Sequence, residues 1–214
     1  MEVDMNEIIE SYVDDHTDDL SNLLTDLLAE TETLTGRSRW SIGKVEGKLL
    51  QMLIKISKTK RIVEVGTFTG FSALVMAEAL PDGGIVTTCE NNQTYADIAL
   101  RYFKMSPDRD KIHLKLGPAL DTLKAIGDNC EEFVFIDADK PSYSRYFDEA
   151  VRILLPGGII LVDNVFWRHK IFKKKISNEN AKAIAAFNEK VNRDDRVEKV
   201  MLSIRDGIYL IRKK

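Results

Sequence analysis

Four short apolar runs constrain the fold of this chain more than any other feature. Three of them end at an acidic residue and the fourth enters a glycine loop: 85–89 before Glu90, 133–136 before Asp137, 159–162 before Asp163, and 62–65 before Gly66. Short runs rich in β-branched residues predict strands that are buried on both faces of a parallel sheet. The carboxyl ends of such strands meet at one crevice, where open α/β sheets bind their ligands. The repeated acids therefore favour ligand or metal contacts, in an enzyme that uses a nucleoside cofactor.

Strand and helix patterns alternate along most of the chain. The predicted strands are 62–66, 85–90, 112–116, 132–137 and 159–163, and the helices that follow them are 70–80, 92–105, 118–126, 142–154 and 179–192. The chain then ends with two strands, 197–204 and 207–211, which only Arg205 and Asp206 separate. So short a gap predicts a hairpin turn. The last strand is therefore expected to be antiparallel in a mixed sheet.

The segment before the first strand is predicted to be helical. Apolar residues recur at helical spacing over 4–34, which predicts one or two helices outside the core fold. A linker rich in turn formers follows at 36–43, and a further helix is expected over 45–56. We therefore expect one domain over 1–214, with an N-terminal helical arm and linker at 1–43 and a catalytic core at 44–214.

Composition narrows the class of protein. A net charge of −3 over 214 residues argues against a sequence-independent nucleic-acid binder, although not against a local basic patch. The acidic N-terminal segment does not resemble a secretory signal, and no apolar run reaches the ~18 residues of a membrane span. Cys89 and Cys130 form no Cys-x-x-Cys pair, which argues against a zinc site. We expect a cytoplasmic enzyme with two buried thiols and no membrane partner.

The glycine loop at 64–70 predicts the cofactor site. It lacks the spacing of dinucleotide-binding loops and the lysine of a P-loop, so a nucleoside without phosphates suits it better. Glu90, at the end of the next strand, can accept hydrogen bonds from both ribose hydroxyls. Two plainer interpretations remain open: the glycines form only a tight turn, and Glu90 is a solvated strand end.

Three oxygen donors follow the later strands. Asp137, Asp163 and Asn164 offer carboxylate and amide oxygens, which suit Mg²⁺ or Ca²⁺. Lys140 lies three positions after Asp137. A nearby dication disfavours its ammonium form, so a neutral Lys140 can take a proton from an acceptor hydroxyl. The plainer alternatives are a solvated lysine and a helix or turn cap at 163–164.

These residues resemble a known family. The carrying motifs are IVEVGTFTGFSAL at 62–74, Glu90, GPA at 117–119, FIDADKPSY at 135–143 and LVDNVFW at 161–167. They are similar to class I, S-adenosylmethionine-dependent O-methyltransferases of the caffeoyl-CoA and catechol type, including small bacterial members. The similarity runs from about residue 40 to the C-terminus. It implies an α/β, Rossmann-like methyltransferase fold with a seven-stranded, mostly parallel sheet, a C-terminal antiparallel hairpin and an N-terminal helical arm.

The resemblance also implies a role for each candidate residue. The implied cofactor contacts are Glu64 and Gly66 on the methionine side, Ser72 at the methionine carboxylate, Glu90 at the ribose, Ala119 at the adenine, and Asp137 and Asp139 at the methionine end. The implied metal ligands are Asp137, Asp163 and Asn164, for Mg²⁺ or alternatively Ca²⁺ or Mn²⁺. The implied catalytic residues are Lys140, as the base, and Asp137.

The chain departs from the family pattern around the expected substrate mouth. Trp40, Ile42 and Pro141 differ from the usual residues, and a basic stretch at 168–175 replaces a glycine-containing loop. That stretch is either a solvated loop or an electrostatic clamp for an anionic substrate, such as a CoA ester or an RNA backbone. Trp40, Phe166 and Trp167 either stack on an aromatic acceptor or pack in the core.

Three functions follow as hypotheses. The first is a metal-dependent O-methyltransferase that acts on a small vicinal-dihydroxy aromatic or its CoA ester. The second, less favoured, is a tRNA hydroxyuridine O-methyltransferase, which the resemblance also allows. The third is a regulatory protein that binds the cofactor without catalysis, and the intact acidic and lysine set argues against it. We also expect a homodimer formed through 4–34 or the neighbouring helix, because the apolar stripe there exceeds what one docked helix needs.

Overall fold

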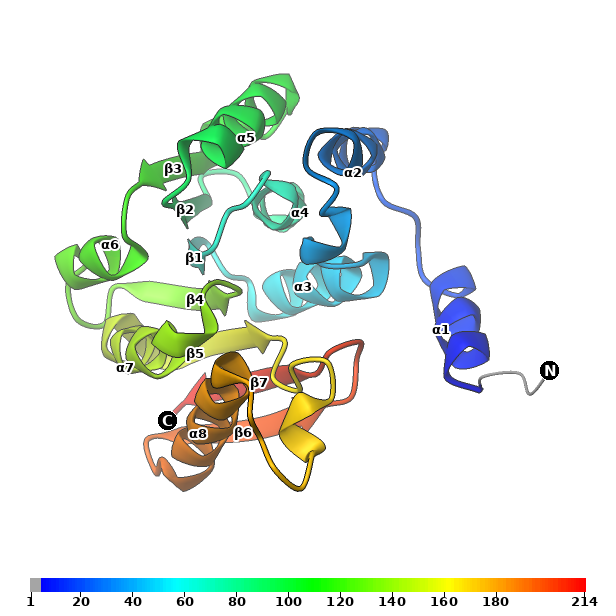
Figure 1. Cartoon of the computed structure of the whole chain (residues 1–214). Coiled ribbons are helices and arrows are strands. Elements are labelled where there is room, and N and C mark those ends of the chain that lie inside the picture. Colours follow the sequence, from blue (N-terminus) through cyan, green and yellow to red (C-terminus); the bar gives the residue numbers. More distant parts are fainter. Residues whose placement is uncertain (1–4) are drawn as a thin grey trace.

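A seven-stranded mixed sheet forms the centre of the computed structural model, which describes residues 5–214, with side chains from residue 8 onward (Figure 1). The strands are β1 (Arg61–Val65), β2 (Ile85–Glu90), β3 (Ile112–Leu116), β4 (Glu131–Ile136), β5 (Leu154–Asp163), β6 (Val197–Leu202) and β7 (Ile208–Lys213). Their order is β3-β2-β1-β4-β5-β7-β6, and β7 alone runs opposite to the other six strands. The predicted fold class, including the antiparallel C-terminal hairpin, is confirmed.

Helices cover both faces of the sheet (Figure 1). They are α1 (Met5–Asp15), α2 (Asn22–Thr35), α3 (Lys44–Ser57), α4 (Phe71–Ala79), α5 (Gln93–Met105), α6 (Ala119–Ala125), α7 (Tyr143–Ile153) and α8 (Glu179–Arg193). Short 3₁₀ turns lie at η1 (Ser38–Trp40), η2 (Arg109–Lys111), η3 (Lys140–Ser142) and η4 (Lys170–Phe172). Helices α2 to α5 pack on one face, and α6 to α8 pack on the other. Over the described part of the chain, no helix combines the length and apolarity needed to cross a membrane.

The two faces of the sheet follow from side-chain alternation within each strand. In β1, Ile62 packs in the layer of α2 to α5, whereas Val63 and Val65 pack in the layer of α6 to α8. Glu64 shares the face of Ile62, so its carboxyl group enters an apolar layer. Helix α4 is apolar on all sides and almost every residue in it is buried, as expected for a helix enclosed by neighbours.

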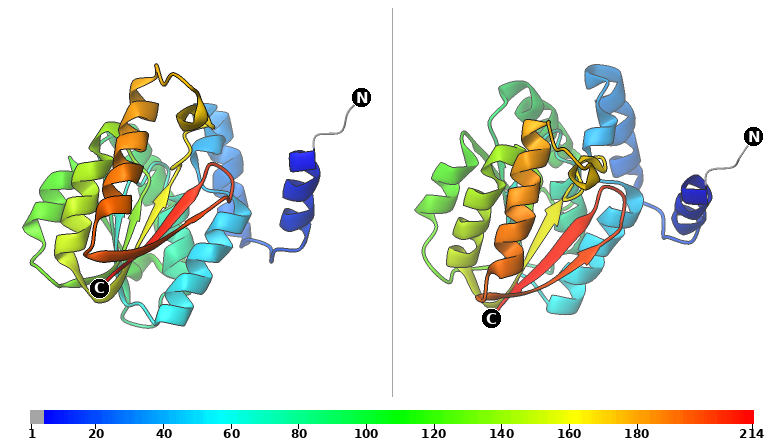
Figure 2. Two further views of the ribbon diagram at one scale, coloured as in Figure 1. Left: turned by 90° about the horizontal axis from the view of Figure 1, so that it is seen from below. Right: turned by 60° about the horizontal axis from the view of Figure 1, so that its bottom comes forward.

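The expectation that the N-terminal helices lie outside the core is wrong for α2. Leu24 and Leu27 are both 0% exposed and belong to the core beside α4. Thr31 shares a hydrogen bond of 2.9 Å with Thr69, and Glu30 bonds to Arg101 of α5. Helix α1 does stand apart from the body in every view (Figures 1 and 2). The apolar stripe of α2 is therefore used inside the molecule.

Two boundaries differ from the sequence-based expectation. Strand β5 begins at Leu154 rather than at 159, because Leu154 already pairs with Glu131. The register then shifts around Gly157 (φ 86°) before Ile159 pairs with Phe133. The C-terminal hairpin turn is longer than two residues. Leu202 pairs with Ile208, which leaves 203–207 as the connection.

Candidate active site

The carboxyl ends of β1, β2, β4 and β5 open into a cavity of about 1320 Å³. Nine of the ten predicted site residues line it: Gly66, Ser72, Glu90, Ala119, Asp137, Asp139, Lys140, Asp163 and Asn164. The tenth, Glu64, does not. The topology therefore gathers residues that are up to about a hundred positions apart in the sequence, as parallel strands ending at one edge must.

Gly66 brings the end of β1 against the end of β4. Its φ of 105° is a conformation that side-chain-bearing residues rarely adopt. A Cβ there would lie 2.0 Å from the carbonyl oxygen of Asp137. The Asp137 amide in turn donates to Val65 at 2.9 Å. The glycine is thus needed for the close approach of the two strand ends that form the cavity floor.

Glu90 fixes the glycine loop to the end of β2. Its carboxylate accepts hydrogen bonds from the backbone amides of Phe68 at 2.7 Å, Asn92 at 2.8 Å and Asn91 at 3.0 Å. Burial raises the pKa of Glu90, and these three hydrogen bonds oppose the rise. Each carboxylate oxygen can accept more than one hydrogen bond, so Glu90 still has acceptor capacity for hydroxyls in the cavity.

Glu64 lies beneath the glycine loop rather than in the cavity. The side chain is 0% exposed, and the Thr88 hydroxyl donates to its Oε2. Its Oε1 has no hydrogen-bond partner among the described residues. Burial raises the pKa of Glu64 to about 7. Contact between Glu64 and a cofactor stays a prediction.

Lys140 joins the ends of β4 and β5. Its Nζ donates to Asp137 Oδ1 at 2.9 Å, to Asn164 Oδ1 at 2.7 Å and to the Tyr143 hydroxyl at 2.5 Å. The Tyr143 hydroxyl then donates to the backbone oxygen of Asp163 at 3.1 Å. Two of the three predicted metal ligands thus already converge on one cation.

Asp163 and Asn164 form a tight turn at the end of β5. The backbone amide of Asn164 donates to Asp163 Oδ1 at 2.6 Å, and Asn164 itself has a φ of 61°. Asp163 is 3% exposed, and burial raises its pKa, as do the negative charges of Glu46 and Asp137, whereas Lys140 lowers it. A further positive charge beside Asp163 would therefore stabilise its carboxylate form.

The three predicted metal ligands are the carboxylates of Asp137 and Asp163 and the side-chain amide of Asn164. Their oxygens suit a hard cation. Over residues 5–214 no group of three or more His, Cys, Asp or Glu side chains is arranged to hold a metal ion. The amide of Asn164 would therefore have to complete the set, because the acidic residues alone do not.

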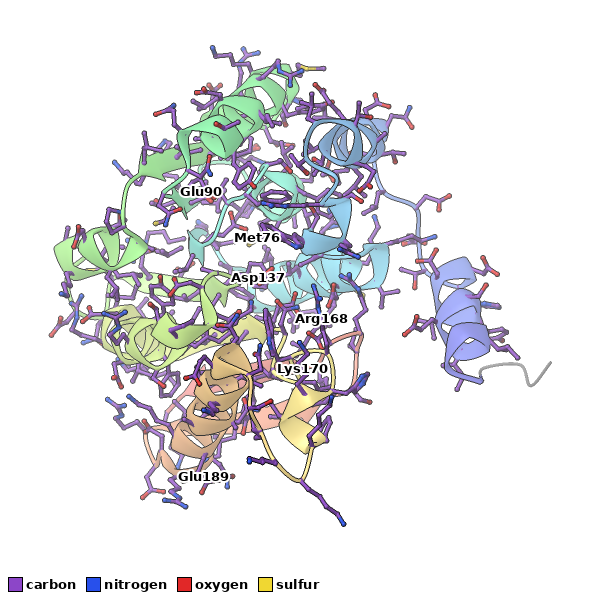
Figure 3. The ribbon with its side chains drawn as sticks, viewed as in Figure 1. Met76, Glu90, Asp137, Arg168, Lys170 and Glu189 are labelled. Carbon is purple, nitrogen blue, oxygen red and sulfur yellow. The ribbon has the colours of Figure 1, made fainter. Side chains whose placement is uncertain are left out.

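Strained backbone is concentrated around the cavity. Of the eight non-glycine residues with positive φ in the described chain, six line it: Phe68, Asn164, Trp167, Arg168, His169 and Arg205. Arg168 and Lys170 come from the loop after β5, on the side of Asp137 away from Glu90 (Figure 3). Lys173, Lys174 and Lys175 are exposed and lie outside the lining. Whether this basic loop binds substrate stays an open prediction.

The predicted aromatic residues have different surroundings. Trp40 is 47% exposed at the cavity and lies under the guanidinium of Arg37. Trp167 also lines the cavity, and its Nε1 donates to Asn178 at 2.9 Å. Phe166 instead packs against Phe172 outside the lining.

Sequence reasoning missed three residues beside the site. Tyr143 belongs to the motif at 135–143, but no role is predicted for it from the sequence. It lies three positions after Lys140, one helical turn away, and this spacing is the signal that could have indicated the contact. The ion pair between Glu46 and Arg205 joins residues that are 159 positions apart, and no local pattern in the sequence predicts it. Only the pairing of β7 with β5 brings the turn that carries Arg205 to the start of α3.

Comparisons with known proteins agree with this architecture. A family model described as O-methyltransferase matches residues 14–214. "Probable caffeoyl-CoA O-methyltransferase 1" of Dictyostelium discoideum is 35% identical over 218 residues, covering 100% of this chain and 95% of the relative. "Catechol O-methyltransferase" of Niastella koreensis is 32% identical and covers 93% and 92%. The solved structure of "the O-methyltransferase from Bacillus cereus in complex SAH" superimposes with a TM-score of 0.87, at 27% identity over 97% of both chains.

Proposed function

Because the chain belongs to the O-methyltransferase family, of the caffeoyl-CoA and catechol type, we propose that it transfers a methyl group from S-adenosylmethionine to a vicinal-dihydroxy aromatic, free or as its CoA ester, with the help of a divalent cation. One observation carries the reaction. Lys140 Nζ lies 2.9 Å from Asp137 and 2.7 Å from Asn164, so a base and two cation ligands share one point of the cavity.

The proposed cofactor position is the half of the cavity between the glycine loop and α6. Glu90 would accept hydrogen bonds from the ribose hydroxyls, and the backbone of Ala119 would face the adenine. Gly66 and Ser72 would lie along the methionine portion. The unpartnered Oε1 of Glu64 supports a cationic group above the loop, and S-adenosylmethionine carries both an ammonium and a sulfonium. The relative solved with SAH supports the same cofactor class.

The proposed metal ligands are Asp137, Asp163 and Asn164, with Mg²⁺ as the expected ion and Ca²⁺ or Mn²⁺ as alternatives. Their fit rests on the oxygen donors and on the two ligands that already surround an ammonium. A bound dication would lower the pKa of the acceptor hydroxyl and fix the direction of its oxygens.

Lys140 is the proposed general base, in the neutral form that a dication bound beside it would favour. Tyr143 and Asp137 hold its Nζ in place, so the group that receives the hydroxyl proton is positioned before the acceptor enters. S-adenosylmethionine supplies the methyl group, whose bond to sulfur breaks as the bond to the acceptor oxygen forms. Trp40 and Trp167, which line the cavity, would hold the aromatic ring in line with that bond.

A hydroxylated uridine in tRNA is the alternative acceptor. The observation in its favour is the basic loop, where Arg168 lines the cavity, Lys170 follows it in the same loop (Figure 3) and three further lysines are exposed at 173–175. A single test separates the two acceptor classes. The protein is incubated with methyl-labelled S-adenosylmethionine and Mg²⁺, together with either a catechol panel or bulk tRNA. Label in a catechol supports the first proposal, label only in tRNA supports the alternative, and label in neither contradicts both.

A further inference from the structure

Arg205 occupies an unusual position in the turn between β6 and β7. Its φ is 45°, in the left-handed region that costs energy for any residue with a Cβ, and Gly207 follows with a φ of 82°. Such outliers gather where a ligand is bound. The Arg205 side chain lines the cavity together with Asp163 and Asn164. The strained backbone thus delivers a guanidinium to the reaction site.

The guanidinium is held on one side by the chain itself. Its Nη1 donates to the Glu46 carboxylate and, at 3.4 Å, to the backbone oxygen of Ser41. Glu46 is 2% exposed, so this ion pair has little freedom. The guanidinium also lies against Gly43, where an added Cβ would be 3.3 Å from Nη1. Arg205 is therefore oriented before any ligand arrives.

The other side of the guanidinium has donors to spare. An arginine carries five N–H groups, and among the described residues only those on Nη1 of Arg205 make hydrogen bonds. The side chain is 39% exposed and lines the cavity, and the edge formed by Nε and Nη2 makes no hydrogen bond with the described residues. Two parallel N–H groups on such an edge match the two oxygens of a carboxylate.

The charge around Arg205 keeps it cationic. Burial lowers the pKa of Arg205, but the Glu46 carboxylate more than offsets this effect, and Asp163 and Asp137 raise the pKa further. Arg168 also lines the cavity, and its backbone amide donates to the carboxylate of Asp206, the residue after Arg205. The acceptor side of the cavity can thus accommodate an anionic group.

We infer that Arg205 is a specificity residue that binds a carboxylate on the acceptor, so that the preferred acceptors are dihydroxyaryl carboxylic acids rather than neutral catechols or CoA thioesters. This inference rests on the proposed function, because it names the acceptor class of the same cavity. Hydrogen bonds to a charged partner predict a preference of about 10- to 100-fold in KM for the acid.

The test compares four acceptors: catechol, a dihydroxybenzoate, a dihydroxycinnamate and its CoA thioester. Steady-state kinetics use the wild type, Arg205→Lys and the double variant Glu46→Gln/Arg205→Gln, which removes both charges and leaves no buried carboxylate unpaired. Arg39→Gln is the matched control, since it removes another cavity-lining arginine. Calorimetry of the same acceptors with SAH-loaded protein gives a readout that does not depend on turnover.

In the double variant, KM for the acids is expected to rise about 10-fold or more, with KM for catechol nearly unchanged. For Arg205→Lys, KM for the acids should lie between the values of the wild type and the double variant. Lysine keeps the positive charge but lacks the two parallel N–H groups of the guanidinium. Arg39→Gln should keep the preference. Equal use of acids and catechol by the wild type, an equal loss for all acceptors, or the same loss in Arg39→Gln would each overturn the inference. If no acceptor is methylated but the acids bind the SAH-loaded protein through Arg205, the proposed function fails, and only the binding of a carboxylate by Arg205 is supported.

Discussion

The ammonium of Lys140 joins the ends of β4 and β5. Asp137, Asn164 and Tyr143 all accept a hydrogen bond from it, and the side chain is only 6% exposed. These contacts hold the Nζ of Lys140 and its oxygen partners in one arrangement. They fit the proposed role of Lys140 as the base, and they also give the site its shape.

Replacing Lys140 tests its role as the base. Lys140→Ala should reduce kcat by about 10²- to 10⁴-fold while S-adenosylmethionine binding is retained, since no proposed cofactor contact is lost. Activity should partly return at high pH, where the acceptor hydroxyl ionises without help. Tyr143→Phe is the control, because it removes only the hydroxyl that orients Nζ and should cost less. A Lys140→Ala enzyme with an unchanged pH–rate profile would contradict the assignment.

Glu64 should make the stability of the cofactor-free protein depend on pH. Its pKa is about 7 in the folded chain against an ordinary value of 4.5, so the folded state binds the proton more tightly. The free energy of unfolding therefore falls as pH rises from 4.5 to 7, by up to ~3 kcal/mol. Glu64→Gln should remove this loss and gain stability over wild type at pH 8 but not at pH 4. Urea unfolding of both proteins at pH 4 and pH 8 measures these free energies. The same difference between Glu64→Gln and the wild type at the two pH values would contradict the role of Glu64.

At the scale of elements, the two N-terminal helices have different roles. Helix α2 contributes Leu24 and Leu27 to the core and carries the polar contacts of Glu30 and Thr31. Helix α1 touches the rest of the chain near Asp14, which lies 3.7 Å from Lys44. We therefore expect the fold to depend on α2 and to tolerate changes on α1.

A pair of substitutions on α2 tests this difference within one helix. Leu27→Ala should lower the free energy of unfolding by about 2–4 kcal/mol, since the side chain is 0% exposed and a cavity would remain. Leu34→Ala, at a position 55% exposed, should change it by less than ~0.5 kcal/mol. Chemical denaturation gives both values. Similar losses for the two variants would mean that α2 is not anchored as described.

The sequence predicts strands better than it predicts contacts between distant elements. The runs ending at Glu90, Asp137 and Asp163 are visible because buried parallel strands are apolar on both faces. The burial of α2 could not be predicted, because an amphipathic stripe does not reveal whether it packs within one chain or between two. The pairing of Glu46 with Arg205 depends on the register of β7 against β5, which no local pattern specifies.

At the scale of the whole molecule, α1 is the one described helix that stands away from the body (Figure 2). Its apolar residues Ile8, Ile9, Tyr12 and Val13 are 47%, 53%, 63% and 40% exposed. Exposed apolar side chains on one helix are typical of interaction surfaces. The sequence pattern predicts a homodimer through 4–34 or the neighbouring helix, and within that range we propose that α1 mediates it.

Light scattering at micromolar concentration tests the dimer. The wild type should have the mass of two chains, and Ile9→Asp combined with Tyr12→Asp should shift it to one. Leu116→Asp is a control, because Leu116 is 52% exposed on the edge strand β3, which lies away from α1 (Figure 1). A wild-type monomer, or a dimer that the α1 substitutions leave intact, would contradict the proposal.

We propose that the oxygens at the ends of β4 and β5 hold a cation that takes part in methyl transfer. The initial rate of label transfer from S-adenosylmethionine to a catechol acceptor tests this role, when it is measured on chelator-treated protein before and after Mg²⁺ is restored. The treated wild type should be inactive, Mg²⁺ should restore its rate, and Asp163→Ala should stay inactive while still binding S-adenosylmethionine. Methylation at the full rate by the chelator-treated enzyme would rule out a metal in the reaction.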